Sequence, residues 1–308
     1  MATTVAQAFT EFAAKLKPTD AQKDKIEARR ARVEDVLLDA YPADDSMPLV
    51  QLRLIGSAGR KTLIRPVDDV DVFAVFDRKA VWSRYKRNSQ EFLYRVRATL
   101  DEYYPIDTIG SRGQAVRVFY SDGLSIDITP AFPHYHWFTD EQVGYVIPGG
   151  KGEWVQTDPY YHHDFMAKRN KALENRLKPL VRLLKRWNRV HSNRLRSFHL
   201  EIIAQRVFSR MDASTPANVT KFFKDAHRHL HVKDPAGFSG DLASPLTGNQ
   251  EREIKQSFAY ALEHAQRARE ADECEEIAEA LRQWRLIFGD EFPGYRTTGR
   301  LRLYPRSS

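Results

Sequence analysis

The sequence predicts an α+β protein of two lobes, in which a mixed sheet with helices is followed by a helical lobe. Short apolar runs bounded by turn residues, which are typical of strands, occur before residue 160. From residue 164 onward, apolar side chains recur at helical spacing. The length of 308 residues fits about two domains. We therefore expect a core with N-terminal helices over residues 1–160 and a helical C-terminal lobe over residues 161–308.

The core is expected to begin with helices and to continue with strands. An amphipathic pattern predicts a first helix, Pro18-Thr19-Asp20 breaks it and supplies a cap, and a longer helix follows. Ser121-Asp122-Gly123 lies between two alternating apolar runs and predicts a hairpin. The expected core elements are helices over residues 5–17 and 20–40, a strand over 49–55, the strand that carries Asp69 and Asp71, a helix over about 79–103, and strands over 114–120 and 124–130.

The second half of the chain is expected to be largely helical. An aromatic, Pro- and Gly-rich stretch follows Pro130 and ends near Pro159, and apolar residues at helical spacing begin soon after it. Trp187 is most simply a core anchor between the lobes. The expected helices of this lobe cover residues 164–191, 197–211, 218–230, 249–271 and 273–288.

The composition is that of a globular protein, and its basic charge fits either anionic ligands or simply a mildly basic soluble protein. Hydrophobic residues make up 42% of the chain and aromatic residues 11%, which is enough for a packed core. The net charge of +7 favours phosphate-bearing ligands but does not separate nucleotides from nucleic acid. No apolar run approaches the ~20 residues that span a bilayer, and the N-terminus lacks the pattern of a signal peptide. A single cysteine, Cys274, excludes an internal disulfide framework, so we expect a cytoplasmic protein without a membrane partner.

The segment Gly56-Ser57-Ala58-Gly59-Arg60-Lys61-Thr62 predicts a phosphate-binding turn. Gly has no side chain, so the backbone can lie close to a phosphate and its N–H groups can form an anion-binding nest. Two aspartates, Asp69 and Asp71, follow this turn with one residue between them. Residues two apart on a strand point to the same face, so both carboxylates project together from one edge of the sheet.

A third carboxylate is expected beside this pair. In the strand over residues 124–130, Asp127 faces away from the apolar side chains, and this strand can pair near the one that carries Asp69 and Asp71. Three carboxylates can hold two Mg²⁺ ions about 3.5–4 Å apart, a clamp for in-line phosphoryl displacement. We expect these three aspartates to be the metal ligands and the catalytic residues, with Mn²⁺ able to replace Mg²⁺. Asp127 is also the best candidate to take the proton of the attacking hydroxyl.

This set of residues resembles the pattern of the DNA polymerase β-like nucleotidyltransferase superfamily, in which a Gly-Ser turn and Asp-x-Asp precede a later Asp. Other segments are similar to the bacterial CD-NTases, relatives of cyclic GMP-AMP synthase and oligoadenylate synthase, and the matches cover roughly residues 50–205. The segments are Thr62 and Ile64, Gly152-Glu153-Trp154, Thr157-Asp158-Pro159, Leu183-Leu184-Lys185-Arg186-Trp187-Asn188 and Ser197-Phe198-His199-Leu200-Glu201.

The resemblance implies a bilobal polymerase β-like core with an oligoadenylate-synthase-like helical lobe, braced by N-terminal helices, and an active site in the cleft between the lobes. It also implies template-independent synthesis of a cyclic di- or trinucleotide, or a short oligonucleotide, as a second messenger. The substrates would be ATP and a second nucleotide, GTP, UTP or ATP. In bacteria such a product switches on an effector in anti-phage (CBASS) signalling.

The nucleotide is expected to be held from both lobes. Ser57 and the N–H groups of the turn suit the β- and γ-phosphates. The resemblance implies that Lys185 and Ser197 reach the phosphates from the helical side and that Phe198 stacks on a base. Ser197 also suits the N-cap of its helix, and Phe198 equally suits a core position. The expected nucleotide-binding residues are Gly56, Ser57, Lys61, Thr62, Lys185, Ser197 and Phe198.

Two other functions remain open from the sequence. A nucleotidyltransferase that tails RNA or modifies a protein would explain the basic charge and would need an acceptor groove. An inactive nucleic-acid-binding module would keep the fold, although three intact aspartates and an intact turn argue against it. Nucleic acid is therefore an allowed but not a required partner.

Overall fold

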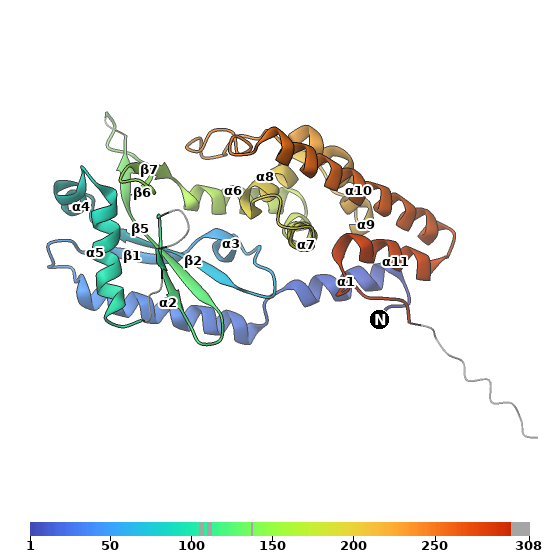
Figure 1. Ribbon diagram of the computed structural model, residues 1–308, viewed down its shortest axis with the longest axis horizontal. Coiled ribbons are helices and arrows are strands. Elements are labelled where there is room, and N and C mark those ends of the chain that lie inside the picture. Colours follow the sequence, from blue (N-terminus) through green and yellow to red (C-terminus); the bar gives the residue numbers. More distant parts are fainter. Residues whose placement is uncertain (105–107, 110–112, 137, 297–308) are drawn as a thin grey trace, which may run out of the picture.

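A mixed sheet forms the core of the first half of the chain (Figure 1). The computed structural model describes residues 1–104, 108–109, 113–136 and 138–296. In the sheet the strand order is β1-β2-β5-β4-β3, and β6 pairs with β5 and β7. The strands are β1 (Leu49–Leu54), β2 (Asp69–Phe76), β3 (Thr108–Ile109), β4 (Val116–Phe119), β5 (Ser125–Tyr135), β6 (Gln142–Pro148) and β7 (Trp154–Thr157).

The central pair of strands, β2 and β5, runs parallel, whereas the neighbouring pairs are antiparallel. Strand β5 is 11 residues long and serves two parts of the sheet. Its first half pairs with β2 and β4, and its second half pairs with β6. The hairpin expected between β4 and β5 is present, and it turns through Gly123 at a φ of 86°. This pairing fixes which side chains of β2, β4 and β5 stand side by side.

Helices cover the sheet and make up most of the described chain from Pro159 onward. Helices α2 and α5 pack on the sheet, where their apolar side chains share one cluster with strands β1, β2, β4 and β5. The helices are α1 (Val5–Leu16), α2 (Asp20–Ala40), α3 (Gly56–Gly59), α4 (Arg78–Tyr85), α5 (Ser89–Asp101), α6 (Pro159–Ala172), α7 (Leu177–Val190), α8 (Ser197–Val207), α9 (Thr215–Asp225), the 3₁₀ helix η1 (Ala226–His229), α10 (Gly248–Glu273) and α11 (Ile277–Phe288).

Local sequence explains where several helices begin. Thr19 and Gln22 form a capping box at the start of α2. Asp158 accepts hydrogen bonds from the first-turn N–H groups of α6, and Pro159 fills a position where no N–H is needed. Ser197 is the first residue of α8 rather than its N-cap, because Arg196 is the cap and makes no side-chain cap hydrogen bond.

Two helices expected to be continuous are each divided in two. The segment over residues 79–103 breaks between α4 and α5, where Asn88 caps the second helix. The segment over residues 164–191 breaks between α6 and α7, where Glu174 and Asn175 adopt φ values of 52° and 61°. These left-handed residues cannot continue a helix, and apolar spacing alone does not reveal them.

The N-terminal helix packs on the helical half of the chain rather than on the sheet. Phe9 of α1 contacts Trp284 and Phe288 of α11 with ring centroids 4.9 Å and 5.8 Å apart. Strand β7 ends at Thr157 and α6 begins at Pro159. The division into residues 1–160 and 161–308 stays a prediction, with α1 as the segment that crosses over.

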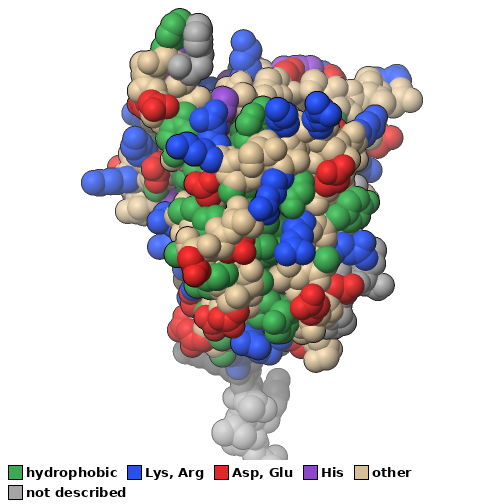
Figure 2. Space-filling view, turned by 90° about the vertical axis from the view of Figure 1, so that its left-hand side faces the viewer, with side chains coloured by type: hydrophobic (Ala, Val, Ile, Leu, Met, Phe, Trp, Pro, Cys, Tyr) green, Lys and Arg blue, Asp and Glu red, His purple; other side chains and the backbone are tan. Residues whose placement is uncertain are grey.

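The surface at the sheet end of the molecule carries both signs of charge. Figure 2 shows Lys and Arg side chains there interspersed with Asp and Glu side chains. The net positive charge of the chain is therefore not gathered into one basic groove on the described part of this face. Among the described residues, no helix combines the length and apolarity needed to cross a bilayer.

Candidate active site

The Gly-Ser turn lies directly against the second aspartate. Strand β1 leads through Ile55, whose N–H donates to the backbone oxygen of Asp71 at 2.9 Å, into the short helix α3. Gly56 has a φ of 57°, and a Cβ placed on it would lie 1.8 Å from Asp71 Oδ2. Only glycine fits such an approach. The turn and the Asp71 carboxylate therefore form one unit, and the expected contact of Gly56 with a phosphate stays a prediction.

The three predicted aspartates occupy one edge of the sheet. Asp69 begins β2, Val70 is buried on the opposite face, and Asp71 follows on the side of Asp69. Strand β5 runs parallel to β2 with Asp127 in register with Asp71. The structure thus brings Asp69, Asp71 and Asp127 together on adjacent strands, from positions up to 58 residues apart in the sequence.

Two of the three carboxylates, Asp69 and Asp71, have a raised pKa. Burial and the charges of Asp69 and Asp127 raise the pKa of Asp71 to about 6, against the opposing effect of Arg60 and Lys185. Burial and Asp127 also raise the pKa of Asp69. A carboxylate cluster that resists ionisation is one that a bound cation would stabilise. The donor set is oxygen only, which suits Mg²⁺ or Mn²⁺.

Asp127 differs from Asp69 and Asp71 because its carboxylate is already paired with the guanidinium of Arg117. Arg117 on β4 is its cross-strand partner in the ladder. Its guanidinium donates from Nε to Asp127 Oδ1 and from Nη2 to Oδ2, each at 2.6 Å. Within the described residues no group of three acidic, histidine or cysteine side chains is close enough to hold a metal ion. The three carboxylates therefore share an edge without yet forming a closed set of ligands.

Glu201 on α8 is a fully buried carboxylate that joins the two lobes. It accepts hydrogen bonds from Arg60 Nε at 2.7 Å and from Thr62 Oγ1 at 2.8 Å, both just after the Gly-Ser turn. From α7, Lys185 Nζ lies 2.6 Å from Glu201 Oε1 and donates to Thr62 Oγ1 at 3.0 Å. Burial raises the pKa of Glu201, but the charges of Arg60 and Lys185 outweigh this effect and bring it to about 2. The carboxylate is thus charged and fully paired.

This network changes the expected roles of three residues. Thr62 is completely buried and bonded to Glu201, so it supports the turn instead of facing a ligand. Lys185 is also buried, and its ammonium group is taken up by Glu201 and Thr62 at the wall of the cleft. Lys61 has a φ of 60° and lines a different cavity of about 560 Å³ beside α2. The structure does not bring Lys61 to the carboxylates.

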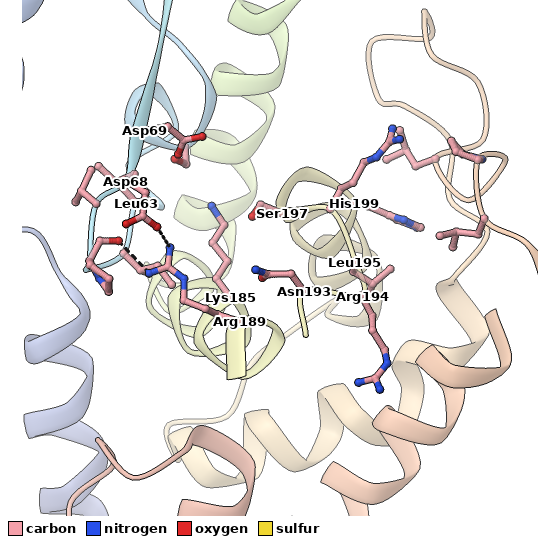
Figure 3. A pocket seen from close by; sticks show the side chains of 18 of the residues that line it. Leu63, Asp68, Asp69, Lys185, Arg189, Asn193, Arg194, Leu195, Ser197 and His199 are labelled. Carbon is pink, nitrogen blue, oxygen red and sulfur yellow. Dashed lines mark hydrogen bonds and ion pairs between the residues drawn. The ribbon is translucent and has the colours of Figure 1, made fainter. Parts of the chain in front are cut away.

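Two cavities meet at the carboxylate edge. The larger, of about 840 Å³, extends from Asp69 along α7 and α8 to the loop that precedes α10 (Figure 3). The smaller, of about 370 Å³, is lined by Asp71, His162 and Phe198 among others. Both cavities are lined by Ser57, Asp69 and Ser197. These three residues, two of them predicted nucleotide contacts, stand where the two halves of the cleft join.

Phe198 forms part of an aromatic and cationic wall. Its ring centroid lies 4.5 Å from that of His162, and the Arg60 guanidinium lies 5.1 Å from it on another side. His162 is in turn held by Asp234 at 2.7 Å. The ring is half-buried and lines the smaller cavity, so it packs on the core and faces the cleft at once.

Sequence reasoning gave no role to four residues that shape this site. Arg60 and Glu201 lie inside recognised motifs, but their pairing over 141 residues is visible only in the fold. The pairing of Arg117 with Asp127 could have been predicted from the sequence, because the hairpin turn fixes which residue of β4 lies opposite Asp127. Arg189 donates from Nη1 to Pro66 O, and its Nη2 lies 3.4 Å from Asp68 Oδ2. Asp68 is thus paired with Arg189 and is not part of the aspartate cluster.

Comparison with known proteins shows which family the chain resembles in sequence. Residues 3–170 match the family model described as Second Messenger Oligonucleotide or Dinucleotide Synthetase domain. A probable cyclic nucleotide synthase of Bacillus cereus (strain VD146) is 24% identical over 272 residues, or 78% of this chain and 81% of that protein. The cyclic AMP-AMP-AMP synthase of Acinetobacter sp. (strain ATCC 27244 / 9458) is 26% identical over 288 residues, covering 84% and 78%.

Solved structures share the fold. The Vibrio cholerae cyclic AMP-GMP synthase DncV superposes with a TM-score of 0.73 at 16% identity, covering 94% of this chain and 98% of that one. CdnC of E. coli MS115-1, solved with ATP, gives a TM-score of 0.72 at 20% identity, covering 94% and 99%. The expected fold, a polymerase β-like core with a helical C-terminal part, is thereby confirmed.

The Glu201 network predicts a large loss of stability when its anion is removed. Glu201→Ala leaves Arg60 and Lys185 buried without their anionic partner, and we expect it to lower the free energy of unfolding by about 3–5 kcal/mol. The measurement is urea denaturation. Glu263→Ala, which breaks an exposed pair with Arg267, is the matched control and is expected to cost about 1 kcal/mol or less. Equal losses in the two variants would show that Glu201 does not hold the lobes together.

The raised pKa of Asp71 predicts that the carboxylate cluster destabilises the metal-free protein near neutral pH. The folded state binds more protons than the unfolded chain between the ordinary pKa of 3.8 and about 6, so stability falls as pH rises through that range. Asp71→Asn removes this cost. In chelator we expect the variant to be more stable than wild type above about pH 6, by up to about 3 kcal/mol, and to lose the advantage near pH 4.

Thermal or urea unfolding at several pH values measures this difference. Asp122→Asn, on the exposed turn between β4 and β5, is the control and should show no gain at neutral pH, because Asp122 is paired with Lys25 and Arg29. A metal-free Asp71→Asn variant less stable than wild type near neutral pH would contradict the electrostatic argument.

Proposed function

The chain belongs to the family of Second Messenger Oligonucleotide or Dinucleotide Synthetase domains, and from this premise we propose that it joins nucleoside triphosphates, without a template, into a cyclic di- or trinucleotide or a short oligonucleotide. It is a nucleotidyltransferase of the CD-NTase class. The proposed substrates are ATP and a second nucleotide, GTP, UTP or a further ATP. Two relatives support this choice, since one is a cyclic AMP-AMP-AMP synthase and the other a cyclic AMP-GMP synthase.

The observation that carries the proposal is the contact of Gly56 with Asp71. It places the backbone of the Gly-Ser turn beside the Asp71 carboxylate, a side chain that can bind a metal ion, at the point where two cavities join. A nucleoside triphosphate needs such a pairing, because its phosphates require both hydrogen-bond donors and divalent cations. Two cavities on either side of the carboxylates also suit one donor and one acceptor nucleotide.

The residues divide the chemistry among them. Asp69, Asp71 and Asp127 would hold two Mg²⁺ or Mn²⁺ ions, which when bound neutralise the departing pyrophosphate and make the acceptor hydroxyl more acidic. Asp127 would accept the proton of that hydroxyl. Ser57 and the backbone N–H groups of the turn would orient the β- and γ-phosphates of the donor.

The helical lobe completes the proposed substrate site. Ser197 lies at the junction of the cavities and would donate to a phosphate. Phe198 presents a ring to the smaller cavity and would stack on a base. Lys185 would add positive charge to the larger cavity without bonding the phosphates directly, since its ammonium group is already bonded to Glu201 and Thr62. Substrate binding would thus draw on both lobes.

We further propose that the product is a second messenger that activates an effector in bacterial anti-phage (CBASS) signalling, and that the protein acts in the cytoplasm. Both points rest on the family alone. The alternative of RNA tailing or protein modification would require a macromolecular acceptor, and it is separated from the main proposal by the experiment below.

The direct test is to incubate purified protein with labelled ATP, GTP, CTP and UTP plus Mg²⁺ or Mn²⁺, and to treat the reaction with phosphatase. We expect a small phosphatase-resistant product, whose mass gives the ring size and the bases. Asp69→Asn with Asp71→Asn should lower its yield at least about a hundredfold, because losing a residue that only orients a metal ligand already costs roughly 10- to 100-fold.

Asp122→Asn serves as the matched control, since Asp122 lies on the turn between β4 and β5, is exposed and is paired with Lys25. It should retain the activity of the wild type. Full product formation by the double variant would contradict the assignment of the site. Label that enters added RNA or protein, with no small product, would favour the alternative function.

A further inference from the structure

We propose that Arg117 holds the third carboxylate, Asp127, in a cation-paired position that a divalent ion has to take over. Arg117 is then a positioning residue that sets how readily the catalytic edge takes up metal. This inference rests on the proposed function, because it concerns the metal ions that the three aspartates would bind.

The geometry of the pair leaves little of Asp127 free. Arg117 Nε and Nη2 each lie 2.6 Å from a different oxygen of the carboxylate, which is the bidentate arrangement and the strongest form of this pair. The Asp127 side chain is only 13% exposed, so water screens the pair weakly. A metal ion that requires an oxygen of Asp127 therefore competes with the guanidinium.

The other two carboxylates are not restrained in this way. Within the part of the chain that the structure describes, the carboxylates of Asp69 and Asp71 accept no side-chain hydrogen bond and form no ion pair. Both face the cleft, whereas Asp127 lines neither of the two cavities that meet there. Two of the three carboxylates, Asp69 and Asp71, are therefore available to a cation, and the third, Asp127, is held by Arg117.

The fold allows this exchange without moving the backbone. Arg117 and Asp127 are directly paired on β4 and β5, so their Cα atoms are fixed by the ladder. The Arg117 side chain is 30% exposed and can swing toward solvent, while the Asp127 carboxylate can turn toward Asp71, its neighbour in register on β2. The exchange replaces the guanidinium of Arg117 at Asp127 by a divalent ion, so the Asp127 carboxylate has a cationic partner before and after it.

Manganese binding without nucleotide tests this inference independently of catalysis. The amount of free Mn²⁺ in titrations of the whole protein is measured by electron paramagnetic resonance. We expect Arg117→Gln to bind Mn²⁺ roughly three- to thirty-fold more tightly than wild type, the range of a contact between neighbouring side chains. Arg117→Lys keeps the positive charge but loses the bidentate hydrogen bonds, and its Mn²⁺ affinity should lie between those of wild type and Arg117→Gln.

Two further variants separate release of Asp127 from a general change in charge. In an Asp127→Asn background, Arg117→Gln should change Mn²⁺ affinity less than about twofold, because the competition is gone. Arg189→Gln removes a charge near Asp69 without touching Asp127, and its effect should be smaller than that of Arg117→Gln. Circular dichroism confirms that each variant is folded, and Arg117→Lys decides the matter if Arg117→Gln is not.

Unchanged or weaker Mn²⁺ binding in folded Arg117 variants would overturn the inference while leaving the proposed function intact. If wild type shows no Mn²⁺ binding that depends on Asp69 and Asp71, the proposed metal site itself is wrong, and the role of Arg117 falls with it. The two failures are therefore distinguishable in one set of titrations.

Discussion

The buried carboxylate of Glu201 is the constraint on which the arrangement of the site depends. It is fully removed from solvent and binds Arg60 and Thr62 from the core together with Lys185 from the helical lobe. A charge buried in this way is tolerated only when its partners stay in place. The two lobes are thus joined by Glu201 at Arg60 and Thr62, the residues that follow the Gly-Ser turn.

This junction also sets the charge balance of the catalytic edge. Arg60 and Lys185 bring two positive charges to one negative charge on Glu201, and the surplus acts on Asp71. Asp71 in turn packs against Gly56 so closely that no other residue fits there. A single chain of contacts therefore runs from the helical lobe through the turn to the carboxylates. It explains why residues without direct access to a substrate belong to the site.

Much of this could be read from the sequence, and the failures have physical causes. Gly56, Asp69 and Asp71 were found because turn chemistry and strand alternation are local rules. Asp127 was predicted on the polar face of a strand that can pair near the Asp69/Asp71 strand, because the apolar residues of that strand alternate. The positions of Thr62 and Lys61 could not be predicted from local sequence. The burial of Thr62 depends on Glu201, a partner 139 residues away, and the direction of the exposed Lys61 side chain depends on a left-handed φ. The helix breaks at Asn88 and Asn175 lie within continuous apolar spacing, which hides them.

The central claim is that the edge formed by β2 and β5 binds divalent cations together with a nucleotide. A crystal structure of the wild type with Mn²⁺ and a non-hydrolysable ATP analogue tests it most directly, because Mn²⁺ is located by its anomalous scattering. We expect two Mn²⁺ ions about 3.5–4 Å apart, bound to Asp69, Asp71 and Asp127, with the triphosphate against the Gly56–Ser57 backbone. Nucleotide bound in the cleft with no Mn²⁺ on these carboxylates would contradict the account.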